Sequence, residues 1–148
     1  MEVSVRVLRS VASNEFCGPS ALSLITGKSV DDCVSVLKDV RQSSRAVKGV
    51  YNGEMREALS HLGYRMHVLP VRGRPTFARL LRSLKGRGPE HIFLINTTSH
   101  YVVLRGRKIY DNKNPEGIFV RQYQHRRARV YASWIVASQA QDLGSPPL

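Results

Sequence analysis

Cysteine, acidic residues and long apolar runs are all scarce in this chain of 148 residues. Its two cysteines, Cys17 and Cys33, are too few for a disulfide framework, so we expect a reducing compartment. No stretch reaches the ~18 apolar residues of a membrane span. The N-terminal segment MEVSVRVLRSVASN lacks the apolar run of a signal peptide. These absences predict a cytoplasmic protein, or one packaged later into a virus particle, with no membrane span and no signal peptide.

The scarcity of acidic residues leaves a large positive charge. Lys and Arg number 23 against 11 Asp and Glu, a net charge of +12. This excess favours an anionic partner, either nucleic acid or an acidic protein surface, and is compatible with a place in a larger assembly. The segment 121–131 mixes basic and aromatic residues, so Arg126, Arg127 and Arg129 are candidate nucleic-acid contacts, with a solvated hairpin end as the alternative. Because Lys and Arg recur along the whole chain, the sequence predicts no single binding stripe.

Recognisable cofactor and metal motifs are also lacking. The five histidines and two cysteines show no metal-ligand spacing. The sequence contains neither a phosphate-binding loop nor a dinucleotide fingerprint. We therefore predict no metal and no cofactor.

Apolar periodicity predicts helices in the first part of the chain and strands in the second. Caps at Ser29, Asn52 and Thr76 mark three of the helix starts. The expected helices cover 18–26, 30–40, 53–62 and 77–85. The expected strands cover 3–7, 64–69, 91–96, 101–104, 108–110, 118–123 and 128–136, the last with a helical alternative. This layout predicts a single α+β domain over 1–138, with N-terminal helices packed on an antiparallel sheet and a disordered tail at 139–148.

Cys17 lies between a turn and a short apolar helix that Gly27 can end. The first N–H groups of a helix have no partner within it, and the helix dipole is positive there, so both favour a thiolate at Cys17. A thiolate is a better nucleophile than a thiol, and the Cys17 N–H can stabilise an oxyanion. The alternative is that Cys17 is a small buried hydrophobic residue, as we expect for Cys33 on the apolar stripe of the next helix.

His100 and Asp111 fall on two strands joined by Gly106-Arg107, which resembles a two-residue hairpin turn. With that turn, His100 and Asp111 share a face and are diagonal neighbours, so the carboxylate can orient the imidazole. A three-residue loop would reverse the parity and bring Asn112 to that face instead. Each residue also has a simpler interpretation, as a surface histidine and a turn-forming aspartate. Together with Cys17 they match the residue types of a cysteine–histidine–acid triad.

Several motifs resemble those of a papain-fold cysteine peptidase, in particular the small double-glycine (bacteriocin-processing) peptidase-like proteins of bacteria and phages. They are Phe-Cys-Gly-Pro-Ser-Ala-Leu at 16–22, Asn-Gly at 52–53, Leu-Gly-Tyr at 62–64, His-Tyr-Val-Val-Leu at 100–104 and Ile-Tyr-Asp at 109–111. The resemblance implies a papain-like fold and cleavage of amide bonds in a peptide or protein substrate. It also implies Cys17 as nucleophile, His100 as base and Asp111 as the orienting acid.

The chain departs from this family pattern before the cysteine. Such enzymes usually carry a glutamine there as an oxyanion donor, but no glutamine precedes Cys17 and position 11 is Val11. Asn14 is the nearest amide side chain and becomes the candidate donor beside the Cys17 N–H, with Ser13 as a weaker one.

Two hypotheses follow from the sequence. One is a cysteine hydrolase that cleaves a peptide or isopeptide bond, which the intact Cys17, His100 and Asp111 favour. The other is a catalytically inactive papain-fold structural or binding protein, for example of a virus particle, whose basic surface meets an anionic partner. The absent glutamine and the net charge favour this second hypothesis.

Overall fold

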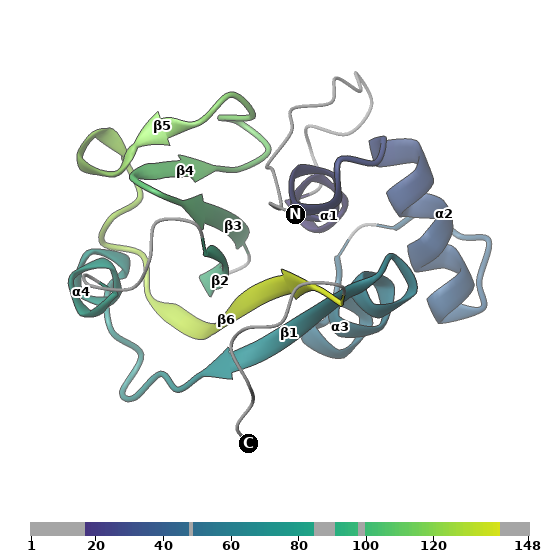
Figure 1. Ribbon diagram of the computed structural model, residues 1–148, viewed down its shortest axis with the longest axis horizontal. Helices are drawn as coiled ribbons and strands as arrows, with labels where there is room; N and C mark the ends of the chain where they lie inside the picture. The colour runs from purple at the N-terminus through teal and green to yellow at the C-terminus, as the bar shows by residue number, and fades with distance from the viewer. Residues whose placement is uncertain (1–16, 48, 85–90, 98–99, 140–148) are drawn as a thin grey trace.

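The computed structural model describes residues 17–47, 49–84, 91–97 and 100–139 (Figure 1). The elements of this part of the chain are α1 (Cys17–Thr26), α2 (Val30–Arg41), α3 (Asn52–His61), β1 (Tyr64–Leu69), α4 (Phe77–Ser83), β2 (Ile92–Thr97), β3 (His100–Arg105), β4 (Lys108–Tyr110), β5 (Ile118–Phe119), the 3-10 helix η2 (Val120–Gln122) and β6 (Val130–Ser138). The expected strand at 3–7, Asn14 and the expected tail from 140 onward lie outside the described residues.

The six strands form one sheet in the order β1-β6-β2-β3-β4-β5, and every neighbouring pair is antiparallel. The last strand, β6, lies between β1 and β2 and pairs with both, so it is an interior strand of the sheet. The helical alternative for this segment is therefore wrong. A central strand can be buried on both faces, and β6 has a run of five buried residues.

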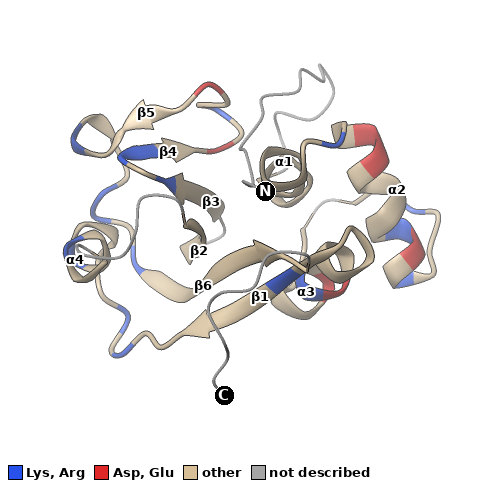
Figure 2. Ribbon diagram, in the orientation of Figure 1, with Lys and Arg blue, Asp and Glu red and all other residues tan. Residues whose placement is uncertain are grey.

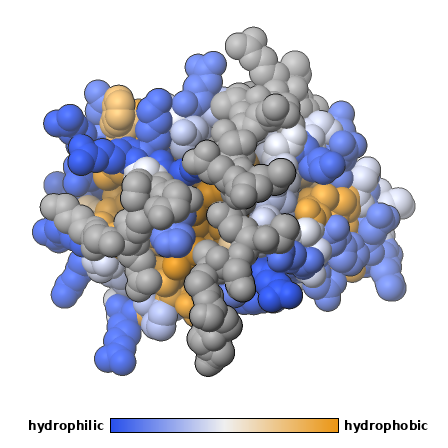
Figure 3. Space-filling view, viewed as in Figure 1, coloured by the Kyte–Doolittle hydropathy of each residue, from blue (hydrophilic) through white to orange (hydrophobic). Residues whose placement is uncertain are grey.

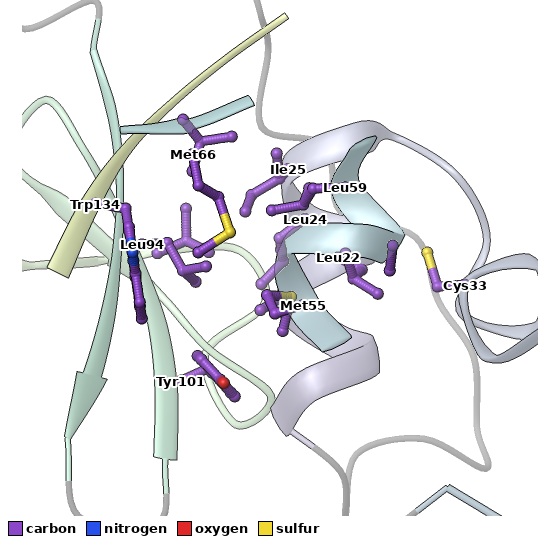
Figure 4. Packing of buried hydrophobic residues seen from close by; sticks show 14 of the residues in the cluster. Leu22, Leu24, Ile25, Cys33, Met55, Leu59, Met66, Leu94, Tyr101 and Trp134 are labelled. Atoms are coloured by element: carbon purple, nitrogen blue, oxygen red, sulfur yellow. The ribbon is translucent and has the colours of Figure 1, made fainter. Parts of the chain in front are cut away.

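Helices cover both faces of the sheet (Figure 1). One hydrophobic cluster joins α1, α2 and α3 to the sheet, and Figure 4 shows Leu24 and Met55 of the helices facing Leu94 and Trp134 of the strands. A second cluster joins α4 to the opposite face through Phe77 and Leu80. The α+β prediction is confirmed at this level: the described residues form four α-helices packed on a six-stranded antiparallel sheet.

The helix ends follow local sequence signals in most cases. Ser29 Oγ accepts from the Asp32 N–H at 3.0 Å, and Thr76 Oγ1 accepts from the Arg79 N–H at 3.2 Å, so both are N-caps as predicted. Gly27, with a φ of 76°, follows the last residue of α1. The left-handed region is strained for residues with a Cβ, so glycine is the natural residue there.

Asn52 is not the N-cap of α3, which is a correction to the sequence prediction. Asn52 is the first residue of the helix, and the N-cap is Tyr51, whose N–H donates to Glu54 Oε1 at 3.0 Å. The Asn52 side chain instead turns toward the sheet, where its Oδ1 accepts from the Asn96 amide at 2.9 Å. A partly buried partner outside the helix has therefore replaced the local cap.

The expected strand at 118–123 is also wrong in its second half. Strand β5 contains only Ile118 and Phe119, and the chain then forms η2. Tyr123 follows η2 and packs edge-on against Phe77 of α4, with ring centroids 5.5 Å apart. Turning out of the sheet lets this large side chain enter the second hydrophobic cluster.

Within the described residues, the helices are too short or too polar to cross a membrane.

Candidate active site

The turn between β3 and β4 sets which acidic or amide side chain can meet His100. Arg105 pairs with Lys108 and Leu104 with Ile109, so Gly106 and Arg107 form the two-residue turn that the sequence predicts. In this register His100 and Asp111 are diagonal neighbours. The His100 Nε2 and the Asp111 Oδ2 lie 3.0 Å apart.

Asn112, the alternative partner, does not take this position. It is buried beside Asp111, but the register of β3 with β4 puts position 112 on the opposite face of the hairpin from His100. Asp111 is the neighbour whose carboxylate meets the His100 ring.

Cys17 reaches His100 from the other side. It is the first residue of α1, and its thiol forms a hydrogen bond with the His100 ring. Since Nε2 is engaged by Asp111, Nδ1 is the ring nitrogen left to meet the sulfur. The structure therefore brings together the three side chains that the sequence singled out, from α1, β3 and the end of β4.

The side chains of Cys17, His100 and Asp111 stabilise one another's charged forms. Burial alone would raise the pKa of the Cys17 thiol, but hydrogen bonds from the His100 ring and the Tyr101 backbone, and the positive charge on His100, lower it below its ordinary value. Hydrogen bonds to Asp111 and then to Cys17 raise the pKa of His100 to about 9. These shifts favour a thiolate–imidazolium pair at neutral pH.

Asp111 is the most buried member, with a side chain 2% exposed against 23% for His100. Burial would raise the pKa of its carboxyl, but hydrogen bonds from His100, Asn114 and Tyr123 lower it to about 2. Its Oδ1 accepts from the backbone N–H groups of Lys113 and Asn114 at 3.0 and 2.7 Å and from the Asn114 amide at 3.0 Å. Asp111 is therefore both the partner of His100 and the centre of the turn after β4.

Tyr123 is a site residue that the sequence did not reveal. Its hydroxyl donates to Asp111 Oδ2 at 3.0 Å, on the same oxygen that meets His100. The expected strand through 123 gave no reason to aim this side chain at Asp111. One signal was available: Tyr123 is an aromatic residue within a run of polar and basic residues, which favours burial of its ring.

Contacts behind the site hold the start of α1 against β3 and α3. The Tyr101 hydroxyl lies 3.0 Å from the Val50 carbonyl oxygen and 2.6 Å from Asn52 Oδ1. A Cβ added to Gly18 would lie 2.4 Å from Val50 Cγ2, so only glycine permits this approach. The residue after Cys17 is thus packed directly against the segment that leads into α3.

The remaining candidates divide into three groups. Asn14 lies outside the described residues, and the Cys17 backbone N–H contributes to lowering the pKa of its own thiol. Arg126, Arg127 and Arg129 lie on the segment before β6, on the α4 side of the sheet, away from Cys17. No three His, Cys, Asp or Glu side chains among the described residues are grouped to hold a metal ion.

Comparison of the chain with protein-family models, with curated proteins and with solved structures gives no significant match.

Proposed function

We propose that this protein is a papain-like cysteine hydrolase that cleaves a peptide or isopeptide bond, with Cys17, His100 and Asp111 as its triad. The observation that supports this most strongly is the continuous chain of contacts from the Cys17 thiol through His100 to Asp111. The fold is compatible with this proposal, because a helix start carries the cysteine and the adjoining antiparallel strands carry the histidine and the acid.

The first half of the proposed reaction is acylation. The Cys17 thiolate attacks the carbonyl carbon of the scissile amide, and a C–S bond forms while the carbonyl oxygen becomes an oxyanion. The oxyanion collapses, the C–N bond breaks, and protonated His100 gives its proton to the leaving amine. The products are a free amine and a thioester on Cys17.

The second half is deacylation by water. Neutral His100 takes a proton from a water molecule, whose oxygen attacks the thioester carbonyl. The C–S bond then breaks, a carboxylic acid leaves and the thiolate–imidazolium pair is restored. Asp111 fixes the ring so that Nδ1 faces the sulfur, and it stabilises the imidazolium in both halves.

The acceptor of the acyl group separates hydrolysis from related reactions. The same three residues would also serve transfer of the acyl group to an amine, or deamidation of a side-chain amide. Water as acceptor leaves a new carboxyl terminus and a new amino terminus, whereas transfer to an amine leaves a new amide.

Peptide cleavage tests the proposal directly. A library of peptides from a digested proteome is incubated with the wild-type protein, with Cys17→Ser and with Cys33→Ala, and new termini are identified by mass spectrometry. We expect the wild-type protein and Cys33→Ala to give the same new termini and Cys17→Ser to give none. Termini that persist in Cys17→Ser, or their absence from the wild-type digest, would count against a Cys17 peptidase.

A further inference from the structure

The positive charge of this protein is concentrated in one part of the fold. Residues 70–139 contain 14 Lys and Arg against 3 Asp and Glu, whereas residues 17–69 contain 7 against 5. In Figure 2, α2 and α3 carry both signs, whereas the charged residues of α4, of the connection before it and of the segment before β6 are all blue. Lys and Arg recur in both parts, as expected from the sequence, but residues 70–139 have more cations and fewer acidic residues to offset them.

Backbone contacts bring two basic segments together at α4. The N–H groups of Phe77 and Ala78 each donate at 2.8 Å, to the carbonyl oxygens of Ala128 and Arg126, and the Val130 N–H donates to Pro75 O at 2.8 Å. These bonds place the connection before α4 beside the segment before β6. We call their exposed cations the α4 basic face: Arg72, Arg74, Arg79, Arg82, Arg127 and Arg129.

The cations of the α4 basic face have no carboxylate partner within the described residues. The ion pairs of the described chain are Arg41–Glu54 and His100–Asp111, both away from this face. The Asp111 carboxylate is hydrogen-bonded to His100 and Tyr123. Uncompensated cations fixed on neighbouring backbone segments produce a positive potential that attracts a polyanion.

An exposed aromatic ring lies within this face. Tyr131 is 44% exposed, and the Arg74 guanidinium stacks 4.7 Å from its ring centroid. Arg74 has a φ of 47° and follows Gly73 with a φ of 68°, so a non-glycine residue is held in the strained left-handed region. Arg129 Nη1 donates to Arg74 O at 3.2 Å and supports this conformation.

We propose that the α4 basic face binds single-stranded nucleic acid. Arginines contact the phosphates, and a base stacks against Tyr131 and Arg74. Nucleic acid fits better than an acidic protein for two reasons. Arginine outnumbers lysine 11 to 3 in residues 70–139, and arginine is the side chain suited to phosphate. An exposed aromatic ring beside arginine also offers a face on which a base can stack.

Hydrophilic side chains project from the α4 side and from the β1–α4 connection in the space-filling view (Figure 3). This inference does not depend on hydrolysis at Cys17, since none of its residues is in the candidate active site.

Binding of a fluorescein-labelled single-stranded DNA of mixed sequence, followed by fluorescence anisotropy across a salt series, tests the proposal. Arg79→Glu/Arg127→Glu removes two exposed cations of the face, and Lys28→Glu/Arg45→Glu makes the same charge change on the helical side. We expect the first variant to weaken binding about tenfold or more, with a salt dependence less steep by about 1.4 in the log–log slope. The control variant should change affinity by about twofold at most.

Stacking is tested separately with Tyr131→Ala against Tyr51→Ala, since Tyr51 is 79% exposed on the helical side. We expect Tyr131→Ala to weaken binding about fivefold or more and Tyr51→Ala to leave it unchanged. Equal losses in the two double variants would overturn the proposal, because net charge alone would then explain binding. Binding of a poly-glutamate peptide as tight as that of the DNA would overturn it in favour of an acidic protein partner.

Discussion

The two cysteines of this chain lie in opposite environments, although both belong to helices of the same layer. Cys33 in the first turn of α2 is 0% exposed and packs in the first hydrophobic cluster, and burial raises its pKa to about 11. Cys17 at the start of α1 is half-buried, and its pKa is lowered. Burial pushes both thiols in the same direction, so the difference comes from His100 and the Tyr101 backbone, which reach Cys17 from β3. A charged partner from another element decides which thiol is reactive.

The largest expected effect is the difference in reactivity between the two thiols. At pH 6 we expect iodoacetamide to alkylate Cys17 at least ~10²-fold faster than Cys33, because the thiolate is the nucleophile and Cys33 stays protonated. Peptide mass spectrometry of timed samples measures both rates. Cys33→Ala should leave the alkylation rate of Cys17 unchanged. Equal alkylation rates at Cys17 and Cys33 in the native protein would contradict the predicted difference in reactivity.

Removing His100 should make Cys17 resemble Cys33. In His100→Ala, burial still raises the Cys17 pKa but the imidazole no longer lowers it, so alkylation at pH 6 should slow by about tenfold or more. The rate should recover at alkaline pH as the thiol ionises. His67→Ala, an exposed histidine of β1, is the matched control. A Cys17 rate that is the same in His100→Ala would mean that the helix start alone activates the thiol.

The His100–Asp111 pair should stabilise the fold only within a pH window. The lowered pKa of Asp111 contributes stability above its ordinary value of 3.8, which is lost as pH falls toward about 2. The raised pKa of His100 contributes stability below its ordinary value of 6.5, which is lost as pH rises through about 9. The free energy of unfolding of the wild-type protein should therefore exceed that of Asp111→Asn most clearly between about pH 4 and 6.5, by about 2 kcal/mol.

Urea unfolding at several pH values measures this window, with Asp39→Asn on the exposed side of α2 as control. If the free energies of unfolding of the wild-type protein and Asp111→Asn differ by the same amount from pH 3 to 9, Asp111 stabilises the fold only through the turn that it shares with Asn114.

The smallest expected effect belongs to Tyr123. Tyr123→Phe removes one hydrogen bond to a buried carboxylate and should lower the free energy of unfolding by about 1.5 kcal/mol at pH 6. It should also raise the pKa of Asp111, so the acid side of the stability window moves to higher pH. Tyr131→Phe, at an exposed ring, is the control. Equal losses of unfolding free energy in the two variants would show that the hydrogen bond from Tyr123 to Asp111 does not stabilise the fold.

Much of the site could be predicted from the sequence because its spacing is local. The two-residue turn at Gly106-Arg107 fixes the pairing of β3 with β4, and the period of a strand then puts His100 and Asp111 on one face. The caps at Ser29 and Thr76 are likewise set by residues within one helical turn. Such features depend on neighbours in the chain, which a sequence displays directly.

The sequence by itself determined the hairpin register, the two helix starts capped by Ser29 and Thr76, and the apolar burial of Cys33. Only the tertiary structure decided that the Cys17 thiol meets His100, that Tyr123 leaves the expected strand to reach Asp111, and that Asn52 turns from capping a helix to holding Asn96. These contacts join residues on different elements, and each replaces a plausible local role with a partner elsewhere in the fold. A buried polar group must find a hydrogen bond wherever the packing offers one, and the packing is decided by the whole chain.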